Sequence, residues 1–277
     1  MPIPSVNANE IFAALVRFDA ELRSTPQWTS WEENQAHRFA VRKDDKLYPV
    51  KQIIAMATGA PVSSFSGGSE ANNYLRDRGF DIELLHLPTE TETRVALHEL
   101  LLERTPNTIT PQEAYGILAE RFRLTSRLRT QLMENSNEIH WENRVRFARR
   151  KLVDAGLLDG SEQGVWRLRV RDKPCVWVEK VFVEGRPDRQ QGEYALGKAL
   201  WSPKRNRSGD DDYGAMRQVQ PGDFIVHIID KGNVAGVSKV ASYVETNFHG
   251  LPETAWTGVD AYLVRLTDFR PCEPPLS

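Results

Sequence analysis

Two stretches of sequence, ITPQEAYGILAERFRLT (residues 109–125) and HWENRVRFARRKLVDAGLLDGSEQGVWRL (residues 140–168), decide the fold that we expect for the middle of the chain. The first stretch carries a well-specified helix start. Thr110 is placed to cap the helix, Pro111 occupies the first helical position, and Glu113 follows the cap by three residues. A helix is therefore expected to begin at Pro111.

The second stretch predicts a longer helix over about residues 139–155, because its apolar residues recur at helical spacing. The apolar residues are Trp141, Val145, Ala148, Leu152 and Ala155. Gly156 ends this helix, and residues 157–168 predict a hairpin around the turn DGSEQG. With an earlier helix expected at residues 94–104, three helices followed by a hairpin predict a winged helix over residues 92–171.

The region before it, residues 1–88, is expected to form a small α+β module. Ile11, Leu15, Phe18 and Leu22 predict a first helix by their spacing. A hairpin is expected around residues 42–45, and a second helix over residues 51–58. The stretch FSGGSEANNYLRDRGF (residues 65–80) supplies a glycine loop, Ser69 as a helix cap and Gly79 as a helix stop.

The last region, residues 174–277, changes to short strand-forming runs separated by glycine and proline turns. These runs are VWVEKVFVE (176–184), DFIVHIID (223–230), NVAGVSKVASYVE (233–245) and DAYLVRLTDF (260–269). They predict a small β-barrel or half-barrel. The expected fold class is therefore a multidomain α+β protein with domains at residues 1–88, 92–171 and 174–277.

Length and composition agree with two or three globular domains. The chain has 277 residues, of which 40% are hydrophobic and 27% charged, and a single core of this size is unusual. No apolar run approaches the roughly 18 to 20 residues that a membrane helix needs, so we expect a cytoplasmic protein. Cys175 and Cys272 lack the number and spacing of a disulfide framework or a zinc site. No metal or cofactor is expected.

Basic charge is concentrated in the middle of the chain. The whole sequence has a net charge of -2, yet residues 121–171 hold twelve Lys or Arg and six Asp or Glu. A local excess of this kind is typical of a surface that contacts nucleic-acid phosphates. The candidate DNA-contacting residues are Asn143, Arg144, Arg146, Arg150, Lys204 and Arg205. The plain alternative is a solvated helix face.

Residues 109–125 and 140–168 resemble the N-terminal winged-helix domain of Mrr-type restriction endonucleases. The resemblance rests on the Asn-Arg-Val that follows an aromatic residue in the recognition helix, the Ala-Gly-Leu-Leu at its end and the Gly-Val-Trp-Arg-Leu of the wing. It implies DNA binding in a restriction setting. The nuclease domain that normally follows is not found here, so a separate cutting subunit is an expected partner.

The last hundred residues resemble PUA-like domains, in particular the EVE and YTH-like domains that hold a modified base in an aromatic cage. The matching pieces are ALGKALWSPKR (195–205), QPGDFIVHIID (220–230) and NVAGVSKVASYVE (233–245). The first region resembles the N-terminal head domain of McrA-like modification-dependent endonucleases, through YPVKQIIAMATG (48–59) and residues 65–80.

A pocket for a flipped base needs aromatic walls and a few polar groups at one edge. Trp177, Trp201 and Trp256 are the candidate walls, and Ser202 and Ser238 the candidate edge contacts. The plain alternative is that the tryptophans fill a small barrel. Trp201 is the strongest candidate because it stands inside the matching motif, just before two basic residues.

Several patterns suggest enzymatic chemistry, but each has a structural explanation. GEYALGK (192–198) nearly spells a phosphate-binding loop, yet Ala199 replaces the required Ser or Thr and no helix pattern follows. The D-x-K of residues 44–46, with Asp19 upstream, falls in a predicted turn, and residues 210–212 in a predicted solvated loop. His140 lacks the second histidine of an HNH site, and His227 is expected in the core. No nucleophile, base and orienting group can be assembled.

These observations predict a reader of modified double-stranded DNA within a modification-dependent restriction system, a binding protein in which no nuclease motif is found. Two alternatives stay open. One is a metal-dependent restriction endonuclease with an unrecognised centre, and the other is a winged-helix transcription regulator or an RNA-binding protein. The sequence does not specify the modification, the nuclease partner, the oligomeric state or the role of the first region.

Overall fold

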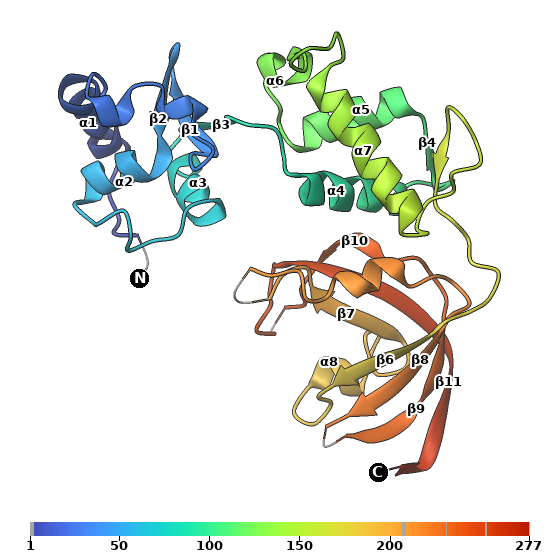
Figure 1. Ribbon diagram of the computed structural model, residues 1–277. Helices are drawn as coiled ribbons and strands as arrows, with labels where there is room; N and C mark the ends of the chain where they lie inside the picture. Colours follow the sequence, from blue (N-terminus) through green and yellow to red (C-terminus); the bar gives the residue numbers. More distant parts are fainter. Residues whose placement is uncertain (1–2, 207–208, 231, 253, 277) are drawn as a thin grey trace. The chain divides into compact units, whose positions relative to one another are not determined.

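The computed structural model describes residues 3–206, 209–230, 232–252 and 254–276. The outer ends of the first and third predicted domains, residues 1, 2 and 277, therefore lie outside the described residues. The fold is mixed α+β, as predicted (Figure 1). The chain forms two compact units, one of Met1–Glu90 with Tyr115–Arg144, the other of Thr91–Ala114 with Val145–Ser277. The predicted domain boundaries stay a prediction.

The first 90 residues build helices around a small antiparallel sheet. The helices are α1 (Ala8–Arg17), continued by a π-helical turn at Phe18–Leu22, α2 (Val50–Thr58) and α3 (Ser69–Arg76). The sheet has the order β2-β1-β3, with β1 (Phe39–Lys43), β2 (Lys46–Pro49) and β3 (Asp81–Leu84). Short 3-10 turns cover Pro26–Trp28 and Trp31–Glu33. The predicted helices and the predicted hairpin are all present.

One local prediction in this region is wrong. Ser69 was expected to cap α3, but Gly68 is the N-cap residue and Ser69 is the first residue of the helix. Gly68 has φ +71° and ψ −131°, a conformation that residues with a side chain rarely adopt. The chain therefore enters α3 through glycine, and no side chain caps this helix.

The middle of the chain contains α4 (Glu90–Leu102), α5 (Pro111–Arg121), α6 (Ser126–Thr130) and α7 (His140–Asp154). A two-stranded sheet pairs β4 (Thr108–Ile109) with β5 (Trp166–Arg167). The helix start at Pro111 is as predicted. The backbone N–H of Thr110 donates to Glu113 Oε2 at 2.9 Å, and that of Glu113 to Thr110 Oγ1 at 3.3 Å.

Two features of this region differ from expectation. Helix α6 was not predicted; Thr125 caps it by accepting the backbone N–H of Leu128 at 3.3 Å. Four residues of the predicted stripe on α7 are buried, but Ala155 is exposed because α7 ends at Asp154. The four buried residues are Trp141, Val145, Ala148 and Leu152.

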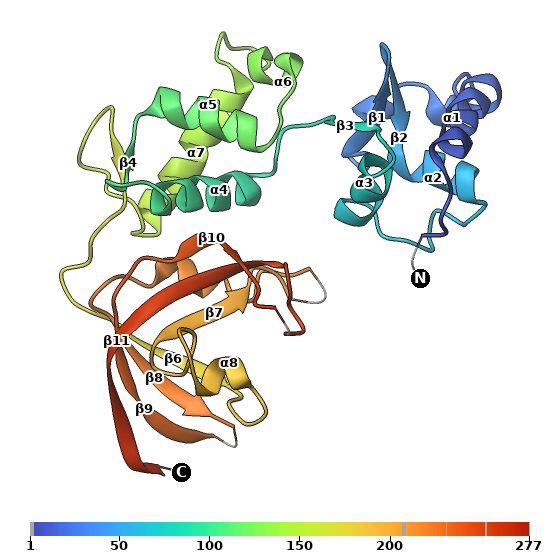
Figure 2. The same cartoon turned by 180° about the vertical axis from the view of Figure 1, so that it is seen from behind.

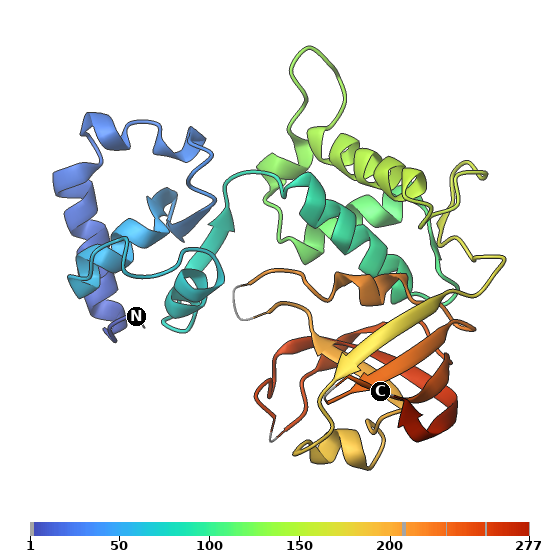
Figure 3. The same cartoon turned by 60° about the horizontal axis from the view of Figure 1, so that its bottom comes forward.

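The last region forms a curled half-barrel sheet (Figure 2). Its strands are β6 (Val176–Val181), β7 (Ala199–Pro203), β8 (Phe224–Ile229), β9 (Asn233–Val240), β10 (Glu245–His249) and β11 (Asp260–Leu276). The order is β10-β11-β9-β8-β6, and β7 pairs with the first part of β11. Strand β6, yellow in Figure 3, is parallel to β8. The short helix α8 (Pro187–Gln190) follows β6.

Strands β7 and β10 and helix α8 were not predicted. Strand β7 directly follows the GEYALGK stretch, where a phosphate-binding loop would need a helix. That stretch is therefore not such a loop. Gly197 within it has φ +82°, and a Cβ there would lie 2.4 Å from the Phe269 ring, so the turn packs directly on β11.

Polar side chains join α4 to this sheet. Glu99 on α4 accepts a hydrogen bond from the Tyr262 hydroxyl at 2.9 Å and lies 3.5 Å from Lys204 Nζ. The Thr246 hydroxyl donates to Glu103 Oε1 at 2.5 Å. Next to Glu99, His98 is buried, and burial together with the charge of Arg217 lowers its pKa to about 4. This junction fixes one side of the sheet that carries the site.

Candidate ligand cavity and basic helix face

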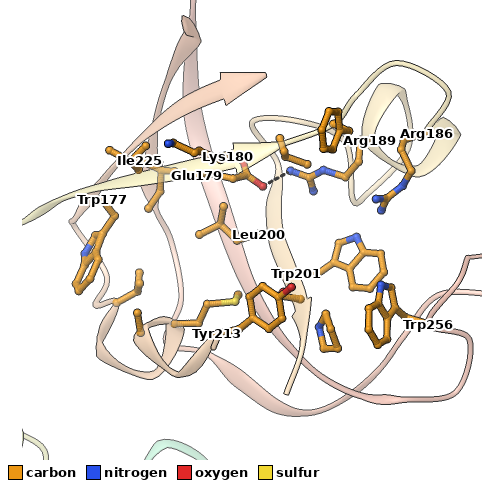
Figure 4. Close-up of a pocket in the computed structure, with 18 residues that line it drawn as sticks. Trp177, Glu179, Lys180, Arg186, Arg189, Leu200, Trp201, Tyr213, Ile225 and Trp256 are labelled. Carbon is orange, nitrogen blue, oxygen red and sulfur yellow. Dashed lines mark hydrogen bonds and ion pairs between the residues drawn. The ribbon is translucent and has the colours of Figure 1, made fainter. Parts of the chain in front are cut away.

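A cavity of about 360 Å³ opens on the curled sheet (Figure 4). Its walls come from β6, from α8 and the residue before it, from β7 and from residues between 213 and 219, with Phe182, Ile225 and Trp256 completing the lining. Pockets for small organic ligands occupy about 300–1,000 Å³. The cavity is therefore large enough for a single planar ring system.

Four of the five predicted pocket residues line this cavity. They are Trp177, Trp201, Ser202 and Trp256. Ser238 does not line it. It points into the core, is only 1% exposed, and its hydroxyl lies 2.8 Å from Nε2 of His227. An edge contact from Ser238 to a ligand is not available in this arrangement.

Trp201 is fixed at one edge and left half-buried in the cavity. Its indole Nε1 donates to Asp188 Oδ2 at 3.3 Å, and the Arg186 guanidinium lies 5.6 Å from the ring centroid. Arg186 also donates two hydrogen bonds to Asp188, at 2.8 and 2.7 Å. Burial raises the pKa of Asp188, but Arg186 more than offsets this, and the pKa lies below its usual value. The carboxylate therefore holds the indole in place.

The three tryptophans do not form one cage. Figure 4 shows Trp201 and Trp256 at one end of the lining and Trp177 at the other. The Trp177 indole donates to Asp223 Oδ2 at 2.8 Å, and Asp223 is buried and also accepts the backbone N–H of Cys175 at 2.8 Å. Trp177 is thus held at the beginning of β6 and β8. Trp201 and Trp256 lie at the other end, and Tyr213 lies nearer to these two than to Trp177.

A row of buried polar side chains supports the cavity. Arg189 is 2% exposed and donates to Glu179 Oε1 at 2.6 Å and to the Ala199 carbonyl at 2.9 Å. Oε2 of Glu179 lies 2.6 Å from Nδ1 of His227, which continues to Ser238. Among the atoms that the structure describes, Arg189 Nε is a buried donor without a partner. Such a donor costs about 1–3 kcal/mol while it stays unpaired.

Ser238, His227 and Glu179 have the order of a hydrolytic triad, which the sequence did not suggest. Their burial argues against that role, because the Ser238 hydroxyl is enclosed and also donates to the Gly197 carbonyl at 3.3 Å. A nucleophile must reach its substrate. We interpret this row as support for the cavity floor.

Sequence reasoning missed the charged part of this site. Glu179, Arg186, Arg189 and Tyr213 line the cavity but were not singled out. One signal was present: β6 alternates between exposed and half-buried residues, and Glu179 falls on the same side as Trp177. The partners of Arg189 are set by the fold and leave no local pattern.

The predicted DNA-contacting residues on helix α7 differ in how far they are exposed. Asn143 donates to Glu138 Oε2 at 3.0 Å, and Arg144 to the Pro88 carbonyl at 3.0 Å. Both are therefore engaged within the protein. Arg146 and Arg150 are exposed, and between and beside them lie Phe147, which is 41% exposed, and Lys151, whose Nζ lies 5.2 Å from the Phe147 ring centroid. We call Arg146, Phe147, Arg150 and Lys151 the basic helix face.

The two predicted basic residues after β7 are only partly available. Lys204 pairs with Glu99 and lies 5.4 Å from the ring centroid of Tyr262. Arg205 is exposed and donates to the Gly209 carbonyl at 2.7 Å. Lys204 therefore serves the junction with α4, and only Arg205 of the two faces solvent.

The carboxylates considered for metal chemistry have other partners. Asp19 accepts from Lys46 Nζ at 2.7 Å, from Arg23 Nε at 2.6 Å and from the Tyr48 hydroxyl at 3.1 Å. Asp44 sits in the hairpin turn with φ +52°. Within the described part of the chain, no group of three or more His, Cys, Asp or Glu side chains is placed to hold a metal ion. Across the same residues, none of the helices combines the length and the apolar character needed to cross a membrane.

One family model matches part of the chain. The model of the Mrr N-terminal domain matches residues 98–172, about a quarter of the 277 residues. The predicted resemblance of this segment is thereby confirmed. No curated protein matches the chain. A solved structure, described as the Type IV phosphorothioation-dependent restriction endonuclease ScoMcrA, aligns with a TM-score of 0.25 and 12% identity, covering 97% of this chain and 68% of that chain.

Proposed function

We propose that this chain reads a modified base in DNA for a modification-dependent restriction or defence system. The sheet cavity holds the base after it leaves the duplex, and the basic helix face holds the neighbouring phosphates. The observation that carries the proposal is the cavity itself, a space of about 360 Å³ whose lining includes Trp201, Trp256 and Tyr213. The match of residues 98–172 to the Mrr N-terminal domain supports the restriction setting.

The lining suits a flipped base for two reasons. Aromatic side chains bind the faces of any base, and an apolar wall accepts an added methyl group without polar demands. Met216, Val219 and Leu200 provide such a wall. At the floor, Arg189 Nε has no partner among the described atoms, so an acceptor on the ligand that reached it would remove the unfavourable free energy of an unpaired donor.

The basic helix face supplies the second half of the mechanism. Arg146, Arg150 and Lys151 are exposed on one helix, and each basic side chain near a phosphate adds affinity that is largely independent of sequence. The division of labour is therefore simple. The helix face binds duplexes of any sequence, and the cavity distinguishes the modified ones.

A binding panel tests this proposal. The duplexes share one sequence and differ in a single change: none, N6-methyladenine, 5-methylcytosine, hydroxymethylated or glucosylated cytosine, or phosphorothioate. We expect one modified duplex to bind more tightly than the plain duplex. Trp201→Ala should reduce that preference about five- to more than a hundredfold, the range measured for loss of a base–aromatic stack, and leave binding to plain DNA nearly unchanged.

Trp201→Phe is the matched variant, because it keeps an aromatic ring but loses the hydrogen bond to Asp188. It should retain most of the preference. If folded Trp201→Ala discriminates as well as the wild type, Trp201 is a packing residue and the cavity is not the reading site. If no member of the panel is preferred, the proposed function is wrong for these modifications.

A further inference from the structure

The N-terminal unit contains a second cavity, of about 450 Å³, that the proposed function does not use. It is lined by Trp28, by residues 36–39, by residues 49–52 at the start of α2, and by Gly67, Gly68 and Asn72 around the start of α3. Gln27 and Val62 complete the lining. All of these residues belong to the same compact unit, so the cavity is a property of this unit alone.

Two helices begin at this cavity. Pro49 is the N-cap of α2, and Val50, Lys51 and Gln52 are its first three residues. Gly68 is the N-cap of α3. Neither cap residue accepts a backbone N–H with its side chain. The first N–H groups of a helix lack partners within the helix and carry a partial positive charge, so two such ends at one cavity favour an anion.

The side chains add to this positive potential. Arg38 and Lys51 line the cavity, and within the described chain its lining includes no Asp or Glu. The Lys51 ammonium lies 5.3 Å from the ring centroid of Phe65, which directs its stem along the loop before α3. Glu70, in the first turn of α3, accepts the backbone N–H of Ser66 at 3.0 Å and is not part of the lining.

Asn72 is an independent sign of a ligand. Asn72 belongs to the cavity lining and is only 3% exposed, and its Oδ1 has no hydrogen-bond partner among the atoms that the structure describes. Buried amide groups are nearly always paired. The aromatic rings of Trp28 and Phe39 lie in the same lining, and they offer an apolar surface beside this polar group.

We propose that this cavity binds a nucleoside phosphate. The phosphate group lies at the two helix starts, with Lys51 and Arg38 as counter-charges, and the base lies against Trp28 and Phe39 with one donor directed to Asn72 Oδ1. Gly68 is needed because its φ of +71° and ψ of −131° bring the backbone into α3 without a side chain. The bound molecule is either a free nucleotide or the phosphorylated end of a DNA strand, which share this chemistry.

Isothermal titration of the full-length chain tests the proposal. The probes are the four deoxynucleoside 5′-monophosphates, the corresponding nucleosides, inorganic phosphate, and a hexanucleotide with and without a 5′-phosphate. We expect a monophosphate to bind at least about tenfold more tightly than its nucleoside, because charge-assisted hydrogen bonds are the stronger class. Lys51→Met should weaken monophosphate binding by about tenfold or more.

Lys43→Met is the matched control, since Lys43 lies on β1 with Asp44 3.4 Å away and outside the lining. It should bind like the wild type. Arg38→Gln serves as a second test if Lys51→Met does not fold. If the 5′-phosphorylated hexanucleotide binds more tightly than the monophosphate, the ligand is a strand end. If the monophosphate binds more tightly, the ligand is a free nucleotide. Either result supports the site.

Three results would overturn the proposal: equal binding of nucleoside and monophosphate, undiminished binding by folded Lys51→Met and Arg38→Gln, or no binding by any probe. Trp201→Ala separates this site from the sheet cavity. That variant should bind the monophosphate normally even where it has lost the preference for a modified duplex. A loss of monophosphate binding in Trp201→Ala would place the nucleotide in the sheet cavity instead.

Discussion

The two cavities of this chain are built by different means. The sheet cavity takes its character from side chains: half-buried Trp201 and Trp256, and charged groups that pair among themselves. The N-terminal cavity takes its character from backbone, because the starts of α2 and α3 both lie in its lining. Aromatic side chains are present in both, but the tryptophans that line the sheet cavity are half-buried, whereas Trp28 in the N-terminal cavity is only 8% exposed. The difference shows that the residue type alone does not define a binding wall.

The largest expected effect contrasts the tryptophans of the two cavities. Trp28 is buried and contacts the rings of Phe18 and Trp31, so Trp28→Ala should lower the free energy of unfolding by about 3–5 kcal/mol. Trp201→Ala should lower it by less than half of that, because Trp201 is half-buried. Urea unfolding of the two variants measures both values. Equal losses of unfolding free energy would show that Trp201 is as much a core residue as Trp28.

The next effect concerns pH and the unit that contains the sheet. His98 is 5% exposed and its pKa is lowered to about 4 by burial. In the unfolded chain, the pKa of this histidine has its ordinary value of about 6.5. A depressed histidine pKa contributes stability that is complete above about 6.5 and is lost as pH falls toward 4. The loss should approach about 3 kcal/mol at pH 4.

The measurement for His98 is urea unfolding from pH 7 to pH 4, compared with His98→Gln. The stability of the wild type relative to His98→Gln should fall by about 3 kcal/mol as the pH is lowered through that window. A constant difference would show that His98 titrates alike in the folded and unfolded states. Asp19 in the N-terminal unit loses its contribution to stability only at lower pH, because its pKa lies below the usual carboxyl value. Burial raises this pKa, but the hydrogen bonds from Lys46 and Arg23 more than offset that effect.

The smallest effect concerns the basic helix face. Replacing Arg146 and Arg150 together by Ala removes two candidate phosphate contacts, so the slope of log affinity against log salt should become shallower by roughly two. Modified and plain duplexes should be affected alike. A matched pair of exposed arginines in the N-terminal unit, Arg17 and Arg76, should leave the slope unchanged when replaced by Ala. An unaltered slope in the first variant would move the DNA contact off α7.

The sequence predicted those features that depend on neighbours in the chain. The capping box of Thr110 and Glu113 and the buried stripe of α7 needed only local spacing. Trp201 was recognisable from its motif. The β1–β2 hairpin likewise followed from a polar turn between two apolar runs.

The features that it did not predict depend on distant partners. Arg189 pairs with Glu179 and with carbonyls of Tyr194 and Ala199, and only the folded chain brings these atoms together. Ser238 was placed in the pocket on residue type, but strand register turned it toward His227. The N-terminal cavity was not predicted either, because a helix start without a capping side chain has no recognisable sequence motif.

The junction between α4 and the sheet has a consequence for how such chains can be rearranged in evolution. The match to the Mrr N-terminal domain begins at residue 98, next to Glu99, whose carboxylate meets Tyr262 and Lys204 on the sheet. If recombination at the linker after residue 171 replaced the sheet with another domain, this carboxylate would lose both partners. It would then be either buried without a partner or exposed to water. Chains that exchange the sheet for another domain must therefore also change α4, and residues 99, 204 and 262 are expected to be inherited as a set.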